Sequence, residues 1–320
     1  MHKQAMHAAL ISDKRYQNAS LGGQDLYAGS VRGHLWQSNV TLSKGQVRQR
    51  FVILPGFTEF CEKYAHVAQK MVNLGHDCLI IDWPGQGRSG HLGSQPLMVH
   101  CERFSGHIDA LDQLLVAAGW RQKPFHFLAH SMGGHLALLS SQRFAKQLQT
   151  IALSAPMILP RPRPIWAIRL LGLALGACGF NRHYTPFTTI PSVESLQQFD
   201  DRNLLTTDEA GYLWQTYWFF EKPELRRYGA SVGWVREAYR SAAYAVANPA
   251  FLKDTKTPLL IMMAEKEQVV SNSKISYAAS HLPNADLIEI KGAKHELFNE
   301  TSKIDDDVWD HLTRFWGRHI

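Results

Sequence analysis

One serine, one histidine and a pair of glutamates stand at spacings that suit nucleophilic catalysis. Ser131 lies in the segment AHSMG (129–133), where small residues flank it between an apolar run and a helix-like run. This pattern is typical of a nucleophile elbow, a strained strand-to-helix turn that lifts a serine hydroxyl out of a sheet. The alternative is an ordinary turn without chemistry. A serine at its free pKa is a poor nucleophile, so the first interpretation requires a base and a third group that orients it.

His295 is the predicted base, because it follows an apolar strand-like run near the C-terminus. An elbow serine is followed in the chain first by the acid and then by the histidine. The acid is therefore expected in the loop after the apolar run LLIMMA (259–264). Glu267 is preferred because it lies further into this loop, just before Val269 and Val270, whereas Glu265 is the alternative acid. A charged loop glutamate is more often a solvated surface residue.

The negative charge on the substrate oxygen needs two N–H donors. One is expected from Met132, the residue after the serine, and the other from Phe57, after the run RFVILPG (50–56). Gly56 lets the backbone approach a substrate, although Pro-Gly by itself favours an ordinary turn. The glycine-rich segment 82–90 lacks the lysine of a phosphate-binding P-loop and the spacing of a dinucleotide fingerprint, so it is predicted to be structural.

The elements that position these residues alternate between two periodicities. Strands are predicted over 50–56, 77–85, 124–131, 150–156, 257–267 and 285–296, and helices over 63–75, 107–119, 133–147, 275–283 and 305–320. This order predicts an α/β fold with a mostly parallel, doubly wound sheet. Residues 157–252 show helical patterns without a clear strand and are interpreted as an inserted helical cap. Residues 25–50 are expected to add short antiparallel edge strands, and residues 1–320 are expected to form one domain.

Composition, charge and cysteine spacing favour a globular protein and argue against a disordered, zinc-binding or membrane-spanning one. The 320 residues are 45% hydrophobic and 19% charged, as in a globular domain. The net charge of +6 suits an anionic lipid surface or a nucleic acid, and charge alone selects neither. No nucleic-acid motif accompanies that charge. The four cysteines show no CxxC spacing, which argues against zinc or redox pairing and favours a reducing compartment. We expect no secretory signal in residues 1–20 and no membrane span in 165–180, a short run that contains Arg169.

Together these segments resemble the α/β-hydrolase family, and more narrowly the proteobacterial lysophospholipases, which are related to monoacylglycerol lipases. The resemblance rests on LPGFTEFCEKYAHVA, LIIDWPGQGRSG, FLAHSMGG, IALSAPM, GWVREAYRSA, AEKEQVV and IKGAKHE. It implies that a fatty acid is released from a lysophospholipid by a cytoplasmic enzyme working at the inner membrane face, without a metal or organic cofactor. Pro55, Ala129 and Glu267 depart from the commoner histidine, glycine and aspartate of the wider family.

The cap offers a possible lipid contact. Its segment 161–180 combines an apolar helical stretch with Arg161, Arg163 and Arg169, whose guanidinium groups suit lipid phosphates. The alternative is a buried cap helix with solvated arginines. Aromatic residues in 212–220 are expected either to line an acyl pocket or simply to pack.

Other functions stay open at this point. The nearest alternative is a monoacylglycerol lipase or carboxylesterase with the same catalytic groups. A peptidase of the proline-iminopeptidase type would need an acidic cap residue, such as Glu221 or Glu224, to bind the substrate amine. A non-catalytic lipid-binding protein of the same fold is the alternative outside enzymes. Hydrolysis and acyl transfer both remain open because they share an acyl-enzyme, as do the head group, the chain length and the oligomeric state.

Overall fold

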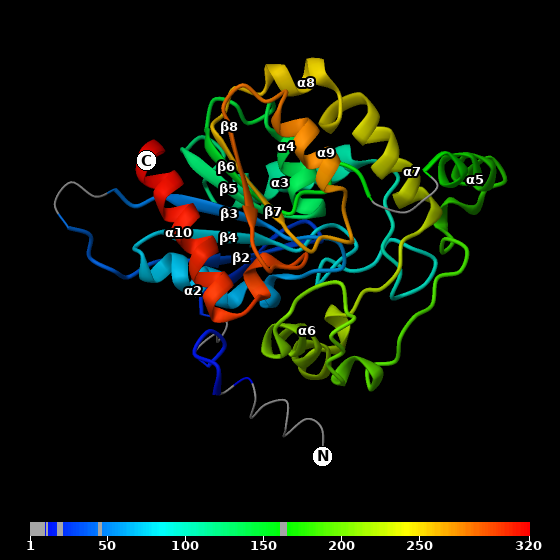
Figure 1. The fold of residues 1–320 in the computed structure, drawn as a ribbon, viewed down its shortest axis with the longest axis horizontal. Coiled ribbons are helices and arrows are strands. Elements are labelled where there is room, and N and C mark those ends of the chain that lie inside the picture. The colour runs from blue at the N-terminus through cyan, green and yellow to red at the C-terminus, as the bar shows by residue number, and fades with distance from the viewer. Residues whose placement is uncertain (1–9, 11, 18–21, 44–46, 161–164) are drawn as a thin grey trace.

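The computed structural model describes residues 10, 12–17, 22–43, 47–160 and 165–320, and a twisted sheet runs through its centre (Figure 1). In these residues the sheet has eight strands in the order β1-β2-β4-β3-β5-β6-β7-β8. Strand β2 pairs antiparallel with β1 and β4, and all other pairs are parallel. The strands are β1 (Gln24–Ala28), β2 (Val31–Trp36), β3 (Arg50–Leu54), β4 (Asp77–Ile81), β5 (Phe125–His130), β6 (Leu148–Ser154), β7 (Leu259–Ala264) and β8 (Ala285–Ile290).

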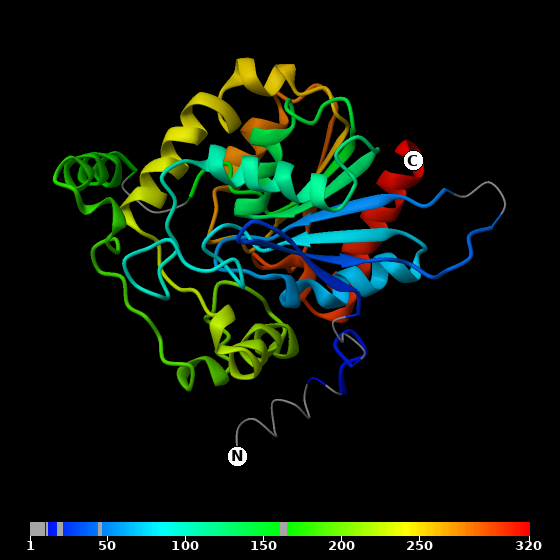
Figure 2. The same ribbon diagram turned by 180° about the vertical axis from the view of Figure 1, so that it is seen from behind.

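Helices cover both faces of the sheet (Figures 1 and 2). Helices α2 (Ala65–Asn73) and α10 (Ser302–His319) pack on one face, and α3 (Phe104–Ala117), α4 (Met132–Ser140) and α9 (Asn272–Ala279) pack on the other. Alternate strand residues serve the two layers: Val52 joins the α3–α4–α9 core, whereas Phe51 and Ile53 join the α2–α10 core. Burial on both faces explains why the central strands are continuously apolar.

The predicted fold class and the antiparallel edge strands are confirmed, but several element boundaries differ, and the largest difference is in one helix. The helix expected over 133–147 ends at Ser140. The hydroxyl of Ser140 donates a hydrogen bond to the carbonyl of Ala137 (3.3 Å), and that of Ser141 donates to the carbonyl of Leu138 (2.7 Å). Such bonds let serine compete with the helical backbone pattern, so residues 141–147 form turns.

Helices and loops occupy the described part of residues 157–252, hereafter the cap segment. Its strand-like pairing is limited to isolated bridges such as Tyr184 with Ser231. Helix α7 packs on α3 and α5, and α6 packs on η1 (Cys61–Tyr64), while α5 lies at the outer edge of the molecule (Figures 1 and 2). The cap helices are α5 (Ile165–Ala177), η2 (Phe180–Arg182), η3 (Ser195–Gln197), α6 (Glu209–Glu221), η4 (Pro223–Leu225), α7 (Val232–Ser241), η5 (Ala242–Val246) and α8 (Pro249–Asp254).

Helix α5 covers residues 165–177 of the apolar run 165–180 and has 13 residues. None of the helices in the described ranges combines the length and the apolar character that crossing a bilayer would take.

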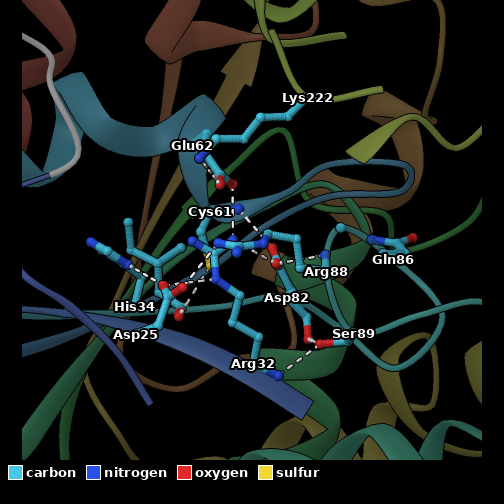
Figure 3. Close-up of polar contacts among 12 residues, drawn as sticks. Asp25, Arg32, His34, Cys61, Glu62, Asp82, Gln86, Arg88, Ser89 and Lys222 are labelled. Carbon is cyan, nitrogen blue, oxygen red and sulfur yellow. Dashed lines mark hydrogen bonds and ion pairs between the residues drawn. The ribbon is translucent and has the colours of Figure 1, made fainter. Parts of the chain in front are cut away.

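A buried ionic cluster joins the N-terminal hairpin to the rest of the molecule (Figure 3). The fully buried Arg32 of β2 donates to Asp25 (2.8 Å), Glu62 (3.0 Å) and Asp82 (3.0 Å), which lie on β1, on η1 and after β4. Glu62 also accepts from Lys222 (3.1 Å), at the end of α6. Burial acts to raise the pKa of Glu62, but the charge and the hydrogen bond of Arg32, together with the charge of Lys222, outweigh it and lower that pKa. One guanidinium therefore ties three separate segments together.

Replacing Arg32 by methionine should lower the free energy of unfolding by about 3–5 kcal/mol, because buried carboxylates would lose their counter-charge. Guanidinium chloride denaturation measures this change. Arg143→Met is the matched control: Arg143 pairs with Asp109 and Asp112, but its side chain is 41% exposed, so its loss should cost less than about 1 kcal/mol. Equal effects of the two substitutions would contradict a stabilising role for the buried cluster.

Candidate active site

The predicted site residues meet at one edge of the sheet. Ser131 follows β5, Phe57 follows β3, Glu267 follows β7 and His295 follows β8. These four strands are parallel, so their carboxyl ends share one edge, which is where ligands bind in open α/β sheets. The topology thus gathers residues that are up to 238 positions apart in the sequence, from Phe57 to His295.

Ser131 occupies a strained turn between β5 and α4. Its φ of 50° lies in the left-handed region, which is rare for a residue with a side chain. The turn brings α4 against the end of β3, so a Cβ on Gly133 would lie 1.9 Å from the carbonyl oxygen of Leu54. Only glycine fits at that position. Ala129, which stands where the wider family has glycine, is accommodated as a buried strand residue paired with Leu54.

Ser131, His295 and Glu267 form a continuous chain of hydrogen bonds. The Oγ of Ser131 lies 3.0 Å from Nε2 of His295, and Nδ1 of His295 lies 2.8 Å from Oε2 of Glu267. A carboxylate only accepts, so Nδ1 carries the proton and Nε2 is free to accept the serine hydroxyl. The three residues are at most 7% exposed. The arrangement suits proton transfer from a serine that attacks a carbonyl carbon.

Glu267 and Glu265 have different surroundings, although they are two residues apart. Glu267 is buried, and its Oε1 accepts the N–H groups of Val269 (2.7 Å) and Val270 (3.1 Å). Burial acts to raise its pKa, but the bond from His295 and these N–H groups outweigh burial and lower it. Glu265 is exposed and instead binds Lys291 and the N–H of Gly292. Glu267 therefore lies against His295 as an ionised carboxylate.

A second histidine lies beside the site and is not placed to act as the base. The rings of His130 and His295 are 4.7 Å apart, but Nδ1 of His130 lies 3.1 Å from the carbonyl oxygen of Ser154. Burial lowers the pKa of His130 to about 4, so its ring stays neutral at neutral pH. This neutral ring packs against His295 without adding a positive charge.

The two expected oxyanion donors are backbone N–H groups. Met132 begins α4, and the N–H groups at a helix N-terminus have no partner within the helix. Phe57 lies in the β3 loop (residues 55–58), and its ring packs on Trp234 of α7 at 4.5 Å. Within the described residues, no hydrogen bond uses the N–H of Phe57 or Met132. Both donors thus remain available to a substrate oxygen.

Sequence reasoning missed the side chains that shape the β3 loop. Gln86 accepts the N–H of Thr58 (3.0 Å) and donates to the carbonyl of Gly56 (3.0 Å), and Trp83 donates to the carbonyl of Pro55 (2.8 Å). Both side chains come from the glycine-rich loop (residues 82–90), which sequence reasoning treated only as a structural turn. The position of the glycine-rich loop directly after β4 could have indicated these contacts. The β3 loop and the glycine-rich loop leave neighbouring parallel strands at the same edge of the sheet.

A metal centre finds no support in the described ranges, where no group of three or more His, Cys, Asp and Glu side chains is placed to hold an ion.

Comparisons with known proteins agree with this architecture. The chain is 32% identical to lysophospholipase L2 of Escherichia coli K12 over 285 residues, which cover 84% of this chain and 80% of that protein. It is 26% identical to phospholipase YtpA of Bacillus subtilis strain 168, covering 84% of this chain and 95% of the relative.

Solved structures show the same fold at lower identity. A soluble variant of monoglyceride lipase from Saccharomyces cerevisiae, in complex with a substrate analogue, superposes with a TM-score of 0.72 at 16% identity. The superposition covers 93% of this chain and 95% of that structure. The family model described as "Serine aminopeptidase, S33" matches residues 45–302. The chain therefore belongs to the serine aminopeptidase S33 family of the α/β-hydrolase fold.

Proposed function

We propose that this protein is a lysophospholipase, a serine hydrolase that releases a fatty acid from a lysophospholipid. The observation that carries the proposal is the hydrogen-bonded chain from Ser131 through His295 to Glu267. The named activities of the Escherichia coli and Bacillus subtilis relatives support a phospholipid ester as the substrate. No step of this reaction needs a cofactor.

The reaction proceeds through an acyl-enzyme. Ser131 Oγ attacks the ester carbonyl carbon while His295 Nε2 takes the hydroxyl proton, and Glu267 stabilises the resulting imidazolium. The N–H groups of Phe57 and Met132 hold the oxyanion, each contributing about 3 kcal/mol in the transition state. The tetrahedral intermediate then expels the glycerophosphodiester alcohol, which receives the proton from His295. Water, activated by the same base, attacks the acyl-Ser131 ester and releases the fatty acid.

The alternatives differ in what binds to the same centre. A peptidase would need an anionic group for the substrate amine, but Glu221 and Glu224 are both exposed. A non-catalytic lipid-binding protein has no need of the three hydrogen-bonded groups. A monoacylglycerol lipase would use the same groups, and the similarity to monoglyceride lipase structures concerns the fold. A lysophospholipid therefore remains the substrate that we propose.

We further infer that the outer helix α5 contacts the anionic inner face of the cytoplasmic membrane. Its side chains Leu170, Leu171 and Leu173 are 60%, 47% and 56% exposed, and an apolar patch of this kind marks an interaction site. Two of the predicted phosphate contacts, Arg161 and Arg163, lie outside the described residues, and Arg169 lies within α5. An apolar helix of a lipid hydrolase fits an acyl–headgroup boundary.

Fatty-acid release from lysophosphatidylethanolamine and from monoacylglycerol, measured side by side, tests the substrate. We expect faster release from the lysophospholipid, reduced at least about 10⁴-fold in Ser131→Ala, because the nucleophile is lost. Product analysis by mass spectrometry separates free fatty acid from acyl groups transferred to a second lipid. Preference for monoacylglycerol would move the assignment to a neutral-lipid lipase. Release from neither substrate would reject a lipid ester and favour the peptidase, which an aminoacyl-naphthylamide reports.

The assignment of the acid predicts unequal effects of two neighbouring substitutions. Glu267→Gln should lower kcat about 10³- to 10⁴-fold, since an amide neither fixes the tautomer of His295 nor stabilises its imidazolium. Glu265→Gln, two residues away and exposed, should change kcat less than about twofold. Steady-state hydrolysis of p-nitrophenyl butyrate measures both. A larger loss in Glu265→Gln would transfer the role to that residue.

Membrane contact is tested by removing the exposed leucines of α5. The variant Leu170→Ser/Leu171→Ser/Leu173→Ser should bind anionic vesicles at least about tenfold more weakly, because even 1.4 kcal/mol of lost apolar burial has that effect. Its hydrolysis of the water-soluble ester should be unchanged. The matched control replaces Leu74, Val116 and Leu287, which are exposed on other elements, and should bind as wild type. Vesicle flotation measures both, and wild-type binding of the α5 variant would reject this contact.

A further inference from the structure

A buried lysine lies between the two loops that carry the proposed catalytic groups. Lys63 of η1 is 1% exposed, and its ammonium contacts Glu59 (2.8 Å), Glu296 (2.6 Å) and Oε1 of Gln215 (2.5 Å). An ammonium has three N–H donors and no acceptor, so these three oxygens satisfy it fully. None of the three partners belongs to the same element: Glu59 precedes η1, Gln215 lies in α6 and Glu296 follows β8.

One arm of this contact reaches the β3 loop. Glu59 Oε1 binds Lys63, while Oε2 accepts the hydroxyl of Tyr64 (2.7 Å) and the N–H of Gly56. Gly56 immediately precedes Phe57, whose N–H is a proposed oxyanion donor. The Glu59 carboxylate therefore holds the Pro55–Gly56 peptide, one peptide before the one that carries the N–H of Phe57, and Lys63 binds that carboxylate.

The other arm reaches the histidine. Glu296 directly follows His295, and its backbone N–H donates to the carbonyl of Leu205 (2.7 Å). Its Oε1 binds Lys63, and its Oε2 accepts from the amide of Asn299 (3.0 Å). Both carboxylate oxygens are thus held, which fixes the chain on the C-terminal side of the proposed base.

The charges of Glu59 and Lys63 are present at neutral pH. Burial acts to raise the pKa of Glu59, but the charge of Lys63 together with the hydrogen bonds from Lys63 and Tyr64 outweighs it, and the pKa falls to about 2. Burial acts to lower the pKa of Lys63, but Glu296 and Glu59 outweigh it and raise it. Without the ammonium, two buried carboxylates would face one another, and each would have to move or take up a proton.

We propose that Lys63 is a positioning residue, which sets the β3 loop and the loop of His295 at the separation that acyl transfer requires. The inference rests on the proposed roles of Phe57 and His295, and it adds a residue that touches neither substrate nor nucleophile. Misplacement of about 1 Å in reacting groups costs about 10²-fold in rate. Loss of Lys63 therefore acts on kcat and leaves substrate affinity largely intact.

The test compares Lys63→Met with Lys222→Met. Lys222 is the matched control, because it also joins α6 to η1 by an ion pair, with Glu62, but contacts neither Glu59 nor Glu296. We expect Lys63→Met to lower kcat for p-nitrophenyl butyrate about 10- to 100-fold, with KM within about threefold of wild type. Labelling of Ser131 by a fluorophosphonate should slow by a similar factor, since its phosphoryl oxygen needs the same N–H donors. Lys222→Met should keep wild-type values of both rates.

A second pair of variants covers the case in which Lys63→Met does not fold. Glu59→Gln keeps an oxygen that accepts from Gly56, whereas Glu59→Leu removes it, so kcat should fall further in Glu59→Leu. Wild-type kcat in Lys63→Met, or equal losses in Lys63→Met and Lys222→Met, would overturn the proposal. If Lys63→Met does not fold, equal kcat in the two Glu59 variants would overturn it. A wild-type protein that is labelled at Ser131 but leaves lysophospholipids intact would reject only the proposed substrate, and absence of labelling would reject both proposals.

Discussion

The close approach of α4 to the end of β3 is the constraint on which the site depends. The backbone of Gly133 lies so near Leu54 that no Cβ fits between them. The same approach bends the chain at Ser131 into a left-handed φ and aims the first turn of α4 at the β3 loop. Strain at one residue is held because the packed strands and helix on either side determine it. The serine hydroxyl therefore lies at the edge of the sheet where the β3 loop and the first turn of α4 also lie.

Buried ion pairs hold the loops around the site, whose positions the strand-to-helix turn at Ser131 does not determine by itself. The adjacent residues Glu62 and Lys63 of η1 serve two different clusters: Glu62 pairs with Arg32 and Lys222, whereas Lys63 pairs with Glu59 and Glu296. Both clusters also contact α6, so one short helical turn joins the sheet, the cap segment and the site. Charged groups in a core cost desolvation energy, which full pairing offsets. Such pairing is directional, as apolar packing is not, and it suits the positioning of loops.

The sequence allowed the prediction of those features that local pattern controls. Apolar runs located the strands, and the small residues around Ser131 identified the turn. The chain order of strands placed Glu267 and His295 after β7 and β8. The features that could not be predicted from the sequence depend on contacts between distant segments. Glu59 and Lys63 stand in a charged stretch that resembles a solvated surface, and only the folded chain shows them buried.

The match to a family described as aminopeptidases and the phospholipase names of the relatives are compatible in physical terms. Esters and amides are both cleaved through an acyl-enzyme, and a serine, a base and two N–H donors serve either. What separates the substrates is the group that binds beyond the carbonyl, and we propose that the cap segment supplies that surface in this chain. There the exposed large hydrophobic side chains of α5 include Leu170, Leu171 and Leu173, while Glu221 and Glu224 are exposed. An apolar outer helix suits a substrate that arrives from a lipid surface better than one that presents a free amine.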